Sequence, residues 1–174
     1  MQNVFADPGS PWATPGFASV LDHNRALIEA FGDRVVFTRF VAPSRPSGAW
    51  VDYYRDWPFA LVGDDDPIYD LVAALPHDGH PVVTRPRFGK WDHARDSLRD
   101  AIGDANEIVL TGVSTDCCVL STALAAADAG VAVHVVDDAC AGLSPEDHAR
   151  ALDAMRLYAP LITVTSTAAV LDLL

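Results

Sequence analysis

The chain has 174 residues, of which 50% are hydrophobic and 21% are charged, the size and composition of one ordered globular domain with a full core. Its formal net charge is −12, from 24 acidic and 12 basic residues, so a nucleic-acid backbone or an anionic membrane surface would repel it overall. No apolar run reaches the ~20 residues that span a bilayer, and no basic segment followed by an apolar one opens the chain. We therefore expect a cytoplasmic protein whose partner is a small molecule.

Helical periodicity and short β-rich runs alternate along the chain. Strands separated by helices imply right-handed crossovers, so we expect an α/β fold with three layers, αβα, around a mostly parallel sheet. In chain order the predicted elements are a helix over 17–31, a strand over 34–40, a helix over 66–75, a strand over 80–84, a helix over 91–102, a strand over 107–111, a helix over 117–129, a strand over 131–136, a helix from 144 to about 158, a strand over 161–164 and a helix over 167–174.

Residues able to carry chemistry follow three of the predicted strands. Thr38 and Arg39 end the first, Lys90 follows the second by a few residues, and the loop from Ser114 to Cys118 follows the third. Because the carboxyl ends of parallel strands meet at one edge of a sheet, these residues are expected to lie together. A thiol where this loop enters a helix meets the positive end of the helix dipole, which favours the thiolate and makes a nucleophile.

Lys90 is the only lysine, because the other eleven basic residues are arginines. Codon bias in a GC-rich genome explains why lysine is scarce, but it does not explain why one is kept. Arginine cannot easily give up a proton, whereas lysine can, so the retained lysine indicates a role that needs an ammonium group with an adjustable pKa.

The histidines are poorly placed to serve as a base for a thiol, since His134 falls in a predicted strand and His23 and His93 in predicted helices. A Cys–His dyad is therefore not expected. His77 and His80 share a loop, but two histidines in a turn are more often solvated polar residues than metal ligands, so we expect neither a metal nor a cofactor. The three cysteines are an odd number and two are adjacent, which is a poor basis for a disulfide framework.

Three segments together resemble the isochorismatase-like cysteine hydrolases, a family that includes nicotinamidases and N-carbamoylsarcosine amidases. The most specific is GVSTDCCVLSTALAAADAG, in which the family's nucleophile is the cysteine directly before Val, here Cys118. The segment VVTRPRFGKW is similar to the one that carries the catalytic lysine and maps it to Lys90. The opening MQNVFADPGS resembles a family segment that places Gln2 and Phe5 near the substrate.

The resemblance covers nearly the whole chain and implies a single domain over 1–174 with a Rossmann-like sheet of about six strands. It also implies a first strand that leads into a catalytic aspartate one position ahead of Met1. The chain as given contains neither. Asp7 does not match the motif. Two explanations stay open, a start site set too late or a homologue that has lost its acid. The first is favoured, because a parallel sheet without a central strand would leave ladder groups unpaired.

The family mechanism implies that the Cys118 thiolate attacks an amide or N-carbamoyl carbon and forms a thioester that water hydrolyses. The backbone N–H groups of Ser114 and Cys118 would form the oxyanion hole, with a cis peptide between Val113 and Ser114. The absent aspartate would carry the proton, and Lys90 would stabilise the thiolate as a cation. The alternative is a non-catalytic member that binds a metabolite or a protein partner. The resemblance further implies a homodimer or a larger homo-oligomer.

The segment 41–65 bears on the substrate. With its flanking residues it contains no histidine, which argues against the metal motif of nicotinamidases. Its aromatic residues suggest a lid, with an arginine that binds a substrate carboxylate. The other interpretation is an insertion whose aromatics pack on the core or on another subunit. The candidate substrate-binding residues from this region are Arg39, Trp50, Tyr54 and Trp57.

Four remaining residues have ordinary structural interpretations. We expect Cys117 to be a small filler on the helix face opposite the nucleophile, and Cys140 to belong to the core. Asp137 and Asp138 end a strand, where either a place in the cleft or a capping role is open.

Overall fold

The computed structural model describes residues 1–92 and 97–174. All of its strand ladders are parallel, but they form two separate sheets. Strand β1 (Phe37–Phe40) pairs with β2 (Val82–Arg85), and β3 (Glu107–Val113) pairs with β4 (Ala132–Ala141), which pairs with β5 (Ile162–Thr165). The predicted α/β class with a parallel sheet is confirmed. Among the described residues there are five strands, and no ladder joins β1 to β3.

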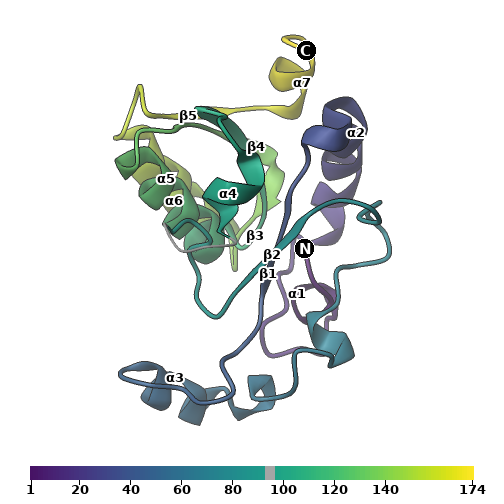
Figure 1. Ribbon diagram of the computed structural model, residues 1–174, viewed down its shortest axis with the longest axis vertical. Coiled ribbons are helices and arrows are strands. Elements are labelled where there is room, and N and C mark those ends of the chain that lie inside the picture. Colours follow the sequence, from purple (N-terminus) through teal and green to yellow (C-terminus); the bar gives the residue numbers. More distant parts are fainter. Residues whose placement is uncertain (93–96) are drawn as a thin grey trace.

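Helices cover both faces of the three-stranded sheet, which gives three layers (Figure 1). Helix α5 (Leu120–Asp128) and α6 (Pro145–Arg156) pack on the face that carries Val133 and Val135, in the largest core cluster. Helix α2 (Leu21–Phe31) and α7 (Thr167–Leu171) pack on the opposite face, against Val136 and Ala139. Alternation along β4 separates Val133 and Val135 from Val136, because successive side chains of a strand point to opposite faces. Beyond Val136 the pairing with β3 changes register, so that Ala139 lies on the face of Val136.

The remaining elements are short, and α4 (Leu98–Ile102) belongs to the core of the three-stranded sheet. Around β1 the buried side chains Phe40, Tyr54 and Tyr69 form a separate cluster that joins the chain before and after this strand. The short elements of the chain are α1 (Asn3–Ala6), α3 (Trp50–Asp56), α4 (Leu98–Ile102) and the 3₁₀ turns Ala18–Val20, Gly32–Arg34, Pro58–Ala60 and Pro67–Tyr69.

The predicted helix over 66–75 is wrong over most of its length. Within 66–75 only Pro67–Tyr69 is helical, although Asp66 caps that turn by accepting the Ile68 N–H. The following residues pair with the start of the chain instead: Asn3 N–H donates to Asp70 O, and Val72 N–H donates to Met1 O. Tertiary pairing thus overrides the helical pattern.

In the predicted helix over 91–102, the described residues include α4, which begins after a capping box formed by Ser97 and Asp100. Residues 93–96 of that prediction lie outside the described residues. The first predicted strand starts later than expected, because Gly32 adopts a φ of +53° and opens a 3₁₀ turn. Strand β4 runs to Ala141, five residues beyond its predicted end.

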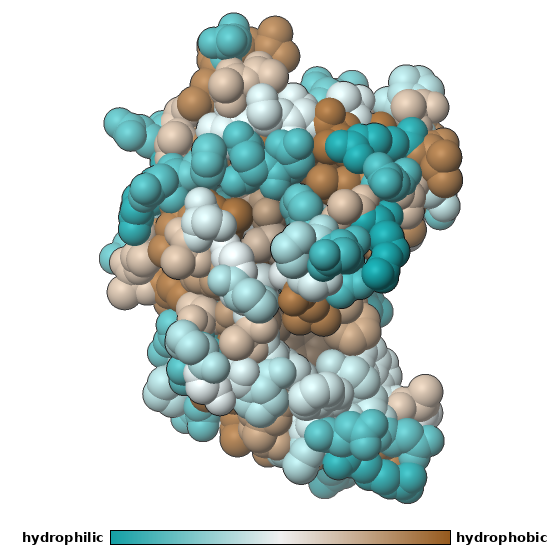
Figure 2. Space-filling model, turned by 180° about the vertical axis from the view of Figure 1, so that it is seen from behind, coloured by the Kyte–Doolittle hydropathy of each residue, from teal (hydrophilic) through white to brown (hydrophobic). Residues whose placement is uncertain are grey.

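Polar residues cover much of the surface, and apolar residues lie among them in small groups, as the rear face shows (Figure 2). Within the described part of the chain, no helix has the length and apolar character needed to cross a membrane.

Candidate active site

Cys118 lies in the turn that links strand β3 to helix α5. The apolar run of β3 ends at Val113, and the Val113–Ser114 peptide bond is cis, as the resemblance implied. Residues Thr115–Val119 form one π-helical turn before α5 begins, so the predicted helix start at Cys117 falls inside this turn. The N–H groups of Cys117 and Val119 both donate to Ser114 O. The strand therefore leads directly into the turn that presents the thiol.

Two side chains fasten this turn to the start of α6. Thr115 Oγ1 is hydrogen-bonded to Nδ1 of His148 at 2.8 Å, and Asp116 Oδ1 accepts the Leu143 N–H at 3.0 Å. Gly142 makes the close approach possible, since a Cβ there would lie 2.8 Å from Asp116 Oδ1 and 2.9 Å from the His148 nitrogen. Sequence reasoning missed these anchors, because residues about 30 positions apart give no local signal.

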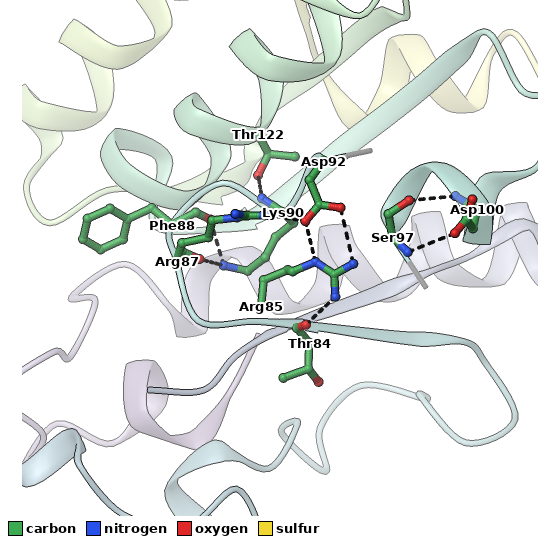
Figure 3. Close-up of polar contacts among 9 residues, drawn as sticks. All are labelled: Thr84, Arg85, Arg87, Phe88, Lys90, Asp92, Ser97, Asp100 and Thr122. Carbon is green, nitrogen blue, oxygen red and sulfur yellow. Dashed lines mark hydrogen bonds and ion pairs between the residues drawn. The ribbon is translucent and has the colours of Figure 1, made fainter. Parts of the chain in front are cut away.

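Lys90 lies on the loop between β2 and α4, and ion pairs close the base of this loop (Figure 3). Arg85 Nε donates to Asp92 Oδ2 at 2.7 Å and Arg85 Nη2 to Asp92 Oδ1 at 3.4 Å, and Arg87 also pairs with Asp92. The Lys90 Nζ donates inside the loop, to Arg87 O at 2.6 Å and to Phe88 O at 2.7 Å. The loop thus supplies two of the acceptors that a buried ammonium needs.

The surroundings of Lys90 shift the pKa of its amine. The residue is 4% exposed, and burial lowers the pKa of its amine, while a neighbouring negative charge on Cys118 would raise it and the Arg87 charge lowers it. Its Nζ also lies 5.4 Å from the centre of the Phe40 ring, within cation–π range. The amine and the thiol are therefore near enough to influence each other.

Both residues line one cavity of about 50 Å³ between the two sheets. Most of its wall is apolar, and the lining residues among those described include no carboxylate. Strands β1 and β3 both contribute to the lining. Of the residues expected to lie together, Thr38, Lys90 and Cys118 line this cavity, whereas Arg39 does not. The lining residues are Met1, Gln2, Phe5, Thr38, Phe40, Lys90, Leu110, Thr111, Gly112, Val113, Cys118, Val119 and Thr122.

Gln2 and Phe5 line the cavity, but the amide of Gln2 is fully occupied by backbone groups. The residue is 1% exposed. Its Nε2 donates to Phe40 O and to Tyr69 O, both at 2.8 Å, and its Oε1 accepts the Phe40 N–H at 2.7 Å. Gln2 thus fixes the end of β1, in addition to lying beside the cavity.

The other predicted substrate-binding residues lie away from this cavity. Arg39 points to the opposite face of β1, where it lines a surface cleft of about 520 Å³ and donates to Thr84 Oγ1 at 3.3 Å. Trp50 packs against Phe88, and Trp57 packs against Trp12. The aromatic segment therefore packs largely on its own neighbours.

Tyr54 is buried in the cluster around β1, whereas the charges of Cys117 and Cys118 act on its neighbour Tyr53. Burial raises the pKa of Tyr53 to about 12, and Cys117 and Cys118 are the next largest causes. The sequence suggested Tyr54 as the substrate-binding tyrosine of this helix. Adjacent helical positions point about 100° apart, so choosing between them needs the direction of the helix.

The remaining cysteines and acids have structural partners. Burial, and then the Asp116 charge, raises the pKa of Cys117 to about 11, and its thiol donates to Asp116 Oδ2 at 3.6 Å. Cys140 belongs to the core, and burial raises its pKa to about 12. Asp138 caps α7 by accepting the Thr167 N–H at 2.8 Å, so capping is its observed role. Within the described ranges no three His, Cys, Asp or Glu side chains gather as a metal site would require.

Comparisons with known sequences give one family. The Isochorismatase domain profile matches residues 1–169. A curated relative, isochorismatase domain-containing protein 2 of Xenopus laevis, is 45% identical over 103 residues, which are 59% of this chain and 50% of the relative. The chain therefore matches about half the length of that relative.

Solved structures give the same result for the fold. The cysteine hydrolase from Pseudomonas syringae pv. phaseolicola 1448A is similar with a TM-score of 0.84 and 21% identity, covering 99% of this chain and 87% of that one. N-carbamoylsarcosine amidase from Thermoplasma acidophilum is similar with a TM-score of 0.73 and 22% identity, covering 96% of this chain and 92% of that one.

Proposed function

The chain belongs to the isochorismatase domain family, as its motifs predicted, and on this premise we propose that it is a cysteine hydrolase that cleaves a small amide or N-carbamoyl C–N bond. The observation that carries the proposal is that Cys118 and the sole lysine, Lys90, line one cavity. Neighbouring positive charge favours a thiolate, which is the nucleophilic form of cysteine.

In the proposed reaction the Cys118 sulfur attacks the carbonyl carbon, and the carbonyl π electrons move to oxygen. The proton that the Cys118 thiol gave up passes to the leaving nitrogen, and the tetrahedral intermediate collapses with loss of ammonia or an amine, which leaves a thioester on Cys118. Water then adds to the thioester and releases the acid and the thiol. Lys90 serves as the cation that stabilises the thiolate before attack and after hydrolysis.

The backbone N–H groups of Ser114 and Cys118 are the proposed oxyanion donors. Ser114 O already accepts the N–H groups of Cys117 and Val119, so those two donors are used within the turn. The anchors on His148 and Leu143 hold the turn in place, and donors that are already oriented cost no reorganisation during the reaction.

The cavity supports a small reacting group. A volume of about 50 Å³ holds only a few heavy atoms, and among the described lining residues Lys90 supplies the only charged side chain. Arg39 lies at a different cleft, so we assign it no contact with the group that reacts. The proposed substrate presents an uncharged primary amide or carbamoyl group to Cys118.

One observation favours a second candidate function. The lining residues among those described include no carboxylate that could take the thiol proton. A non-catalytic family member that binds a small metabolite in the same cavity would need no such acid.

Ammonia release from N-carbamoyl amino acids and simple primary amides tests the proposal. We expect Cys118→Ala to abolish turnover and Lys90→Met to lower kcat by about 10²–10³-fold, because one charge-stabilising group is lost. The matched control is Cys140→Ala, which removes a buried core thiol outside the cavity and is expected to retain turnover. Equal turnover by Cys118→Ala and the unaltered chain would contradict the proposal, and saturable binding without turnover would favour the second candidate.

A further inference from the structure

The hydroxyl of Thr122 joins the backbone of the proposed nucleophile to the backbone of the proposed cation. Thr122 Oγ1 donates to the carbonyl oxygen of Cys118 at 2.6 Å and accepts the N–H of Lys90 at 3.0 Å. Figure 3 shows Thr122 reaching from the helix to the Lys90 backbone. One oxygen atom thus connects two residues that are 28 positions apart.

The bond to Cys118 is a local one that threonine often makes in helices. A hydroxyl at position i can donate to the carbonyl four residues earlier, and this uses its single proton. The oxygen then has lone pairs left to accept another donor. Because Thr122 is 2% exposed, water cannot readily replace the Lys90 N–H as that donor. The pair of bonds therefore satisfies every group involved.

The Lys90 loop also approaches α5 closely at the neighbouring position. A Cβ on Gly89 would lie 3.3 Å from the backbone oxygen of Ser121 and 3.4 Å from its Cβ, which is tight contact. Glycine is thus the residue that lets the loop rest against the helix beside Thr122. Two adjacent contacts, one polar and one steric, fix the loop at this place.

We propose that Thr122 is a positioning residue that sets the placement of Lys90 relative to Cys118. The inference rests on the proposed function, because it concerns the two groups that carry it. The alignment matters since the effect of a cation on a thiolate falls with their separation. Without the Thr122 hydroxyl, the buried Lys90 N–H has no acceptor at its present position, and the loop moves to find one.

The test measures the rate at which iodoacetamide alkylates Cys118 at pH 7, resolved from Cys117 and Cys140 by peptide mass spectrometry. Thr122→Val keeps the shape and removes both bonds, and we expect it to slow alkylation by about tenfold, the effect of losing one well-placed hydrogen bond. Thr122→Ser keeps the hydroxyl and is expected to restore most of the rate. Gly89→Ala, which pushes the loop away from α5, is expected to slow alkylation as well.

Thr167→Val is the matched control. Thr167 is also buried and its hydroxyl also donates to a protein oxygen, Asp138 Oδ1 at 2.7 Å, but it lies on α7 away from the cavity. We expect this variant to lose similar stability in urea unfolding and to keep the unaltered rate at Cys118.

A double variant separates positioning from general loosening. If Thr122 acts through Lys90, Thr122→Val has no further effect once Lys90→Met has been introduced. Multiplied effects in the double variant, or an unaltered rate in Thr122→Val, would overturn the inference. A Cys118 that is unreactive in the unaltered chain would instead contradict the proposed function, so the two failures are distinguishable.

Discussion

The two halves of the proposed reactive centre are held in different ways. Cys118 lies in continuous secondary structure, in which strand β3 leads through one π turn into helix α5. Lys90 lies on a loop held by side-chain contacts, such as the Lys90 N–H with Thr122 and Arg85 with Asp92. The Lys90 ammonium also lies over the ring of Phe40, whose backbone Gln2 holds. The thiol side is fixed mainly by backbone geometry, with Thr115 and Asp116 as its anchors, and the lysine side mainly by a few polar side chains.

This difference indicates which substitutions should destabilise the protein most. Many backbone hydrogen bonds together hold a regular strand or helix in position, so the loss of one contact leaves the others in place. A loop held by single side chains loses its position when one of them is removed. Substitutions on the lysine side should therefore cost more stability than comparable ones around β3, β4 and β5.

Gln2→Leu is expected to have the largest effect on stability. It leaves the Phe40 N–H and the carbonyl oxygens of Phe40 and Tyr69 buried without their partner, which destabilises the fold by about 3 kcal/mol. Urea unfolding measures the loss. The control is Asn3→Ala, since the exposed Asn3 amide also donates to a carbonyl, that of Pro67, and it should cost less than about 0.5 kcal/mol. Equal losses in the two variants would break the comparison.

Ser144→Ala tests the thiol side with a smaller expected effect. Ser144 caps α6, which anchors the Cys118 turn, by accepting the Asp147 N–H at 3.0 Å. Removing the cap is expected to cost about 1 kcal/mol, and Ser144→Asp, which keeps a cap oxygen, should stay near the unaltered stability. A loss from Ser144→Ala as large as that of Gln2→Leu would mean that the two sides are equally sensitive.

Tyr53→Phe has the smallest expected effect and appears only at alkaline pH. Burial raises the pKa of Tyr53 to about 12 from 10.0, so the folded chain keeps a proton that the unfolded chain releases. Its contribution to stability is present below pH 10 and is lost as the pH rises through 12. Urea midpoints at pH 8 and pH 11 measure the decline, which Tyr53→Phe should make shallower. If the urea midpoint of Tyr53→Phe fell as much between pH 8 and pH 11 as that of the unaltered chain, ionisation of Tyr53 would not contribute to the decline.

The same contrast explains what the sequence could predict. The elements from Glu107 to Thr165 have their predicted types, because their strand and helix patterns are local and Ser144 marks a helix start, although β4 runs five residues past its predicted end. The candidate site residues Cys118 and Lys90 were predicted from a helix entrance, from an unusual lysine and from the family resemblance. The segment 66–75 was assigned to a helix because its pairing with Met1 to Asn3 leaves no mark in a short window of sequence. The bonds of Gln2 and Thr122 were missed for the same reason.

The central claim is that Cys118 and Lys90 act as one reactive centre, and the alkylation rate of Cys118 tests it most directly. At pH 7, Cys118 of the unaltered chain should react with iodoacetamide faster than free cysteine and faster than Cys117 and Cys140, whose pKa values burial raises. Lys90→Met should remove most of that advantage. A Cys118 that reacts no faster than free cysteine, or that is indifferent to Lys90→Met, would contradict the account.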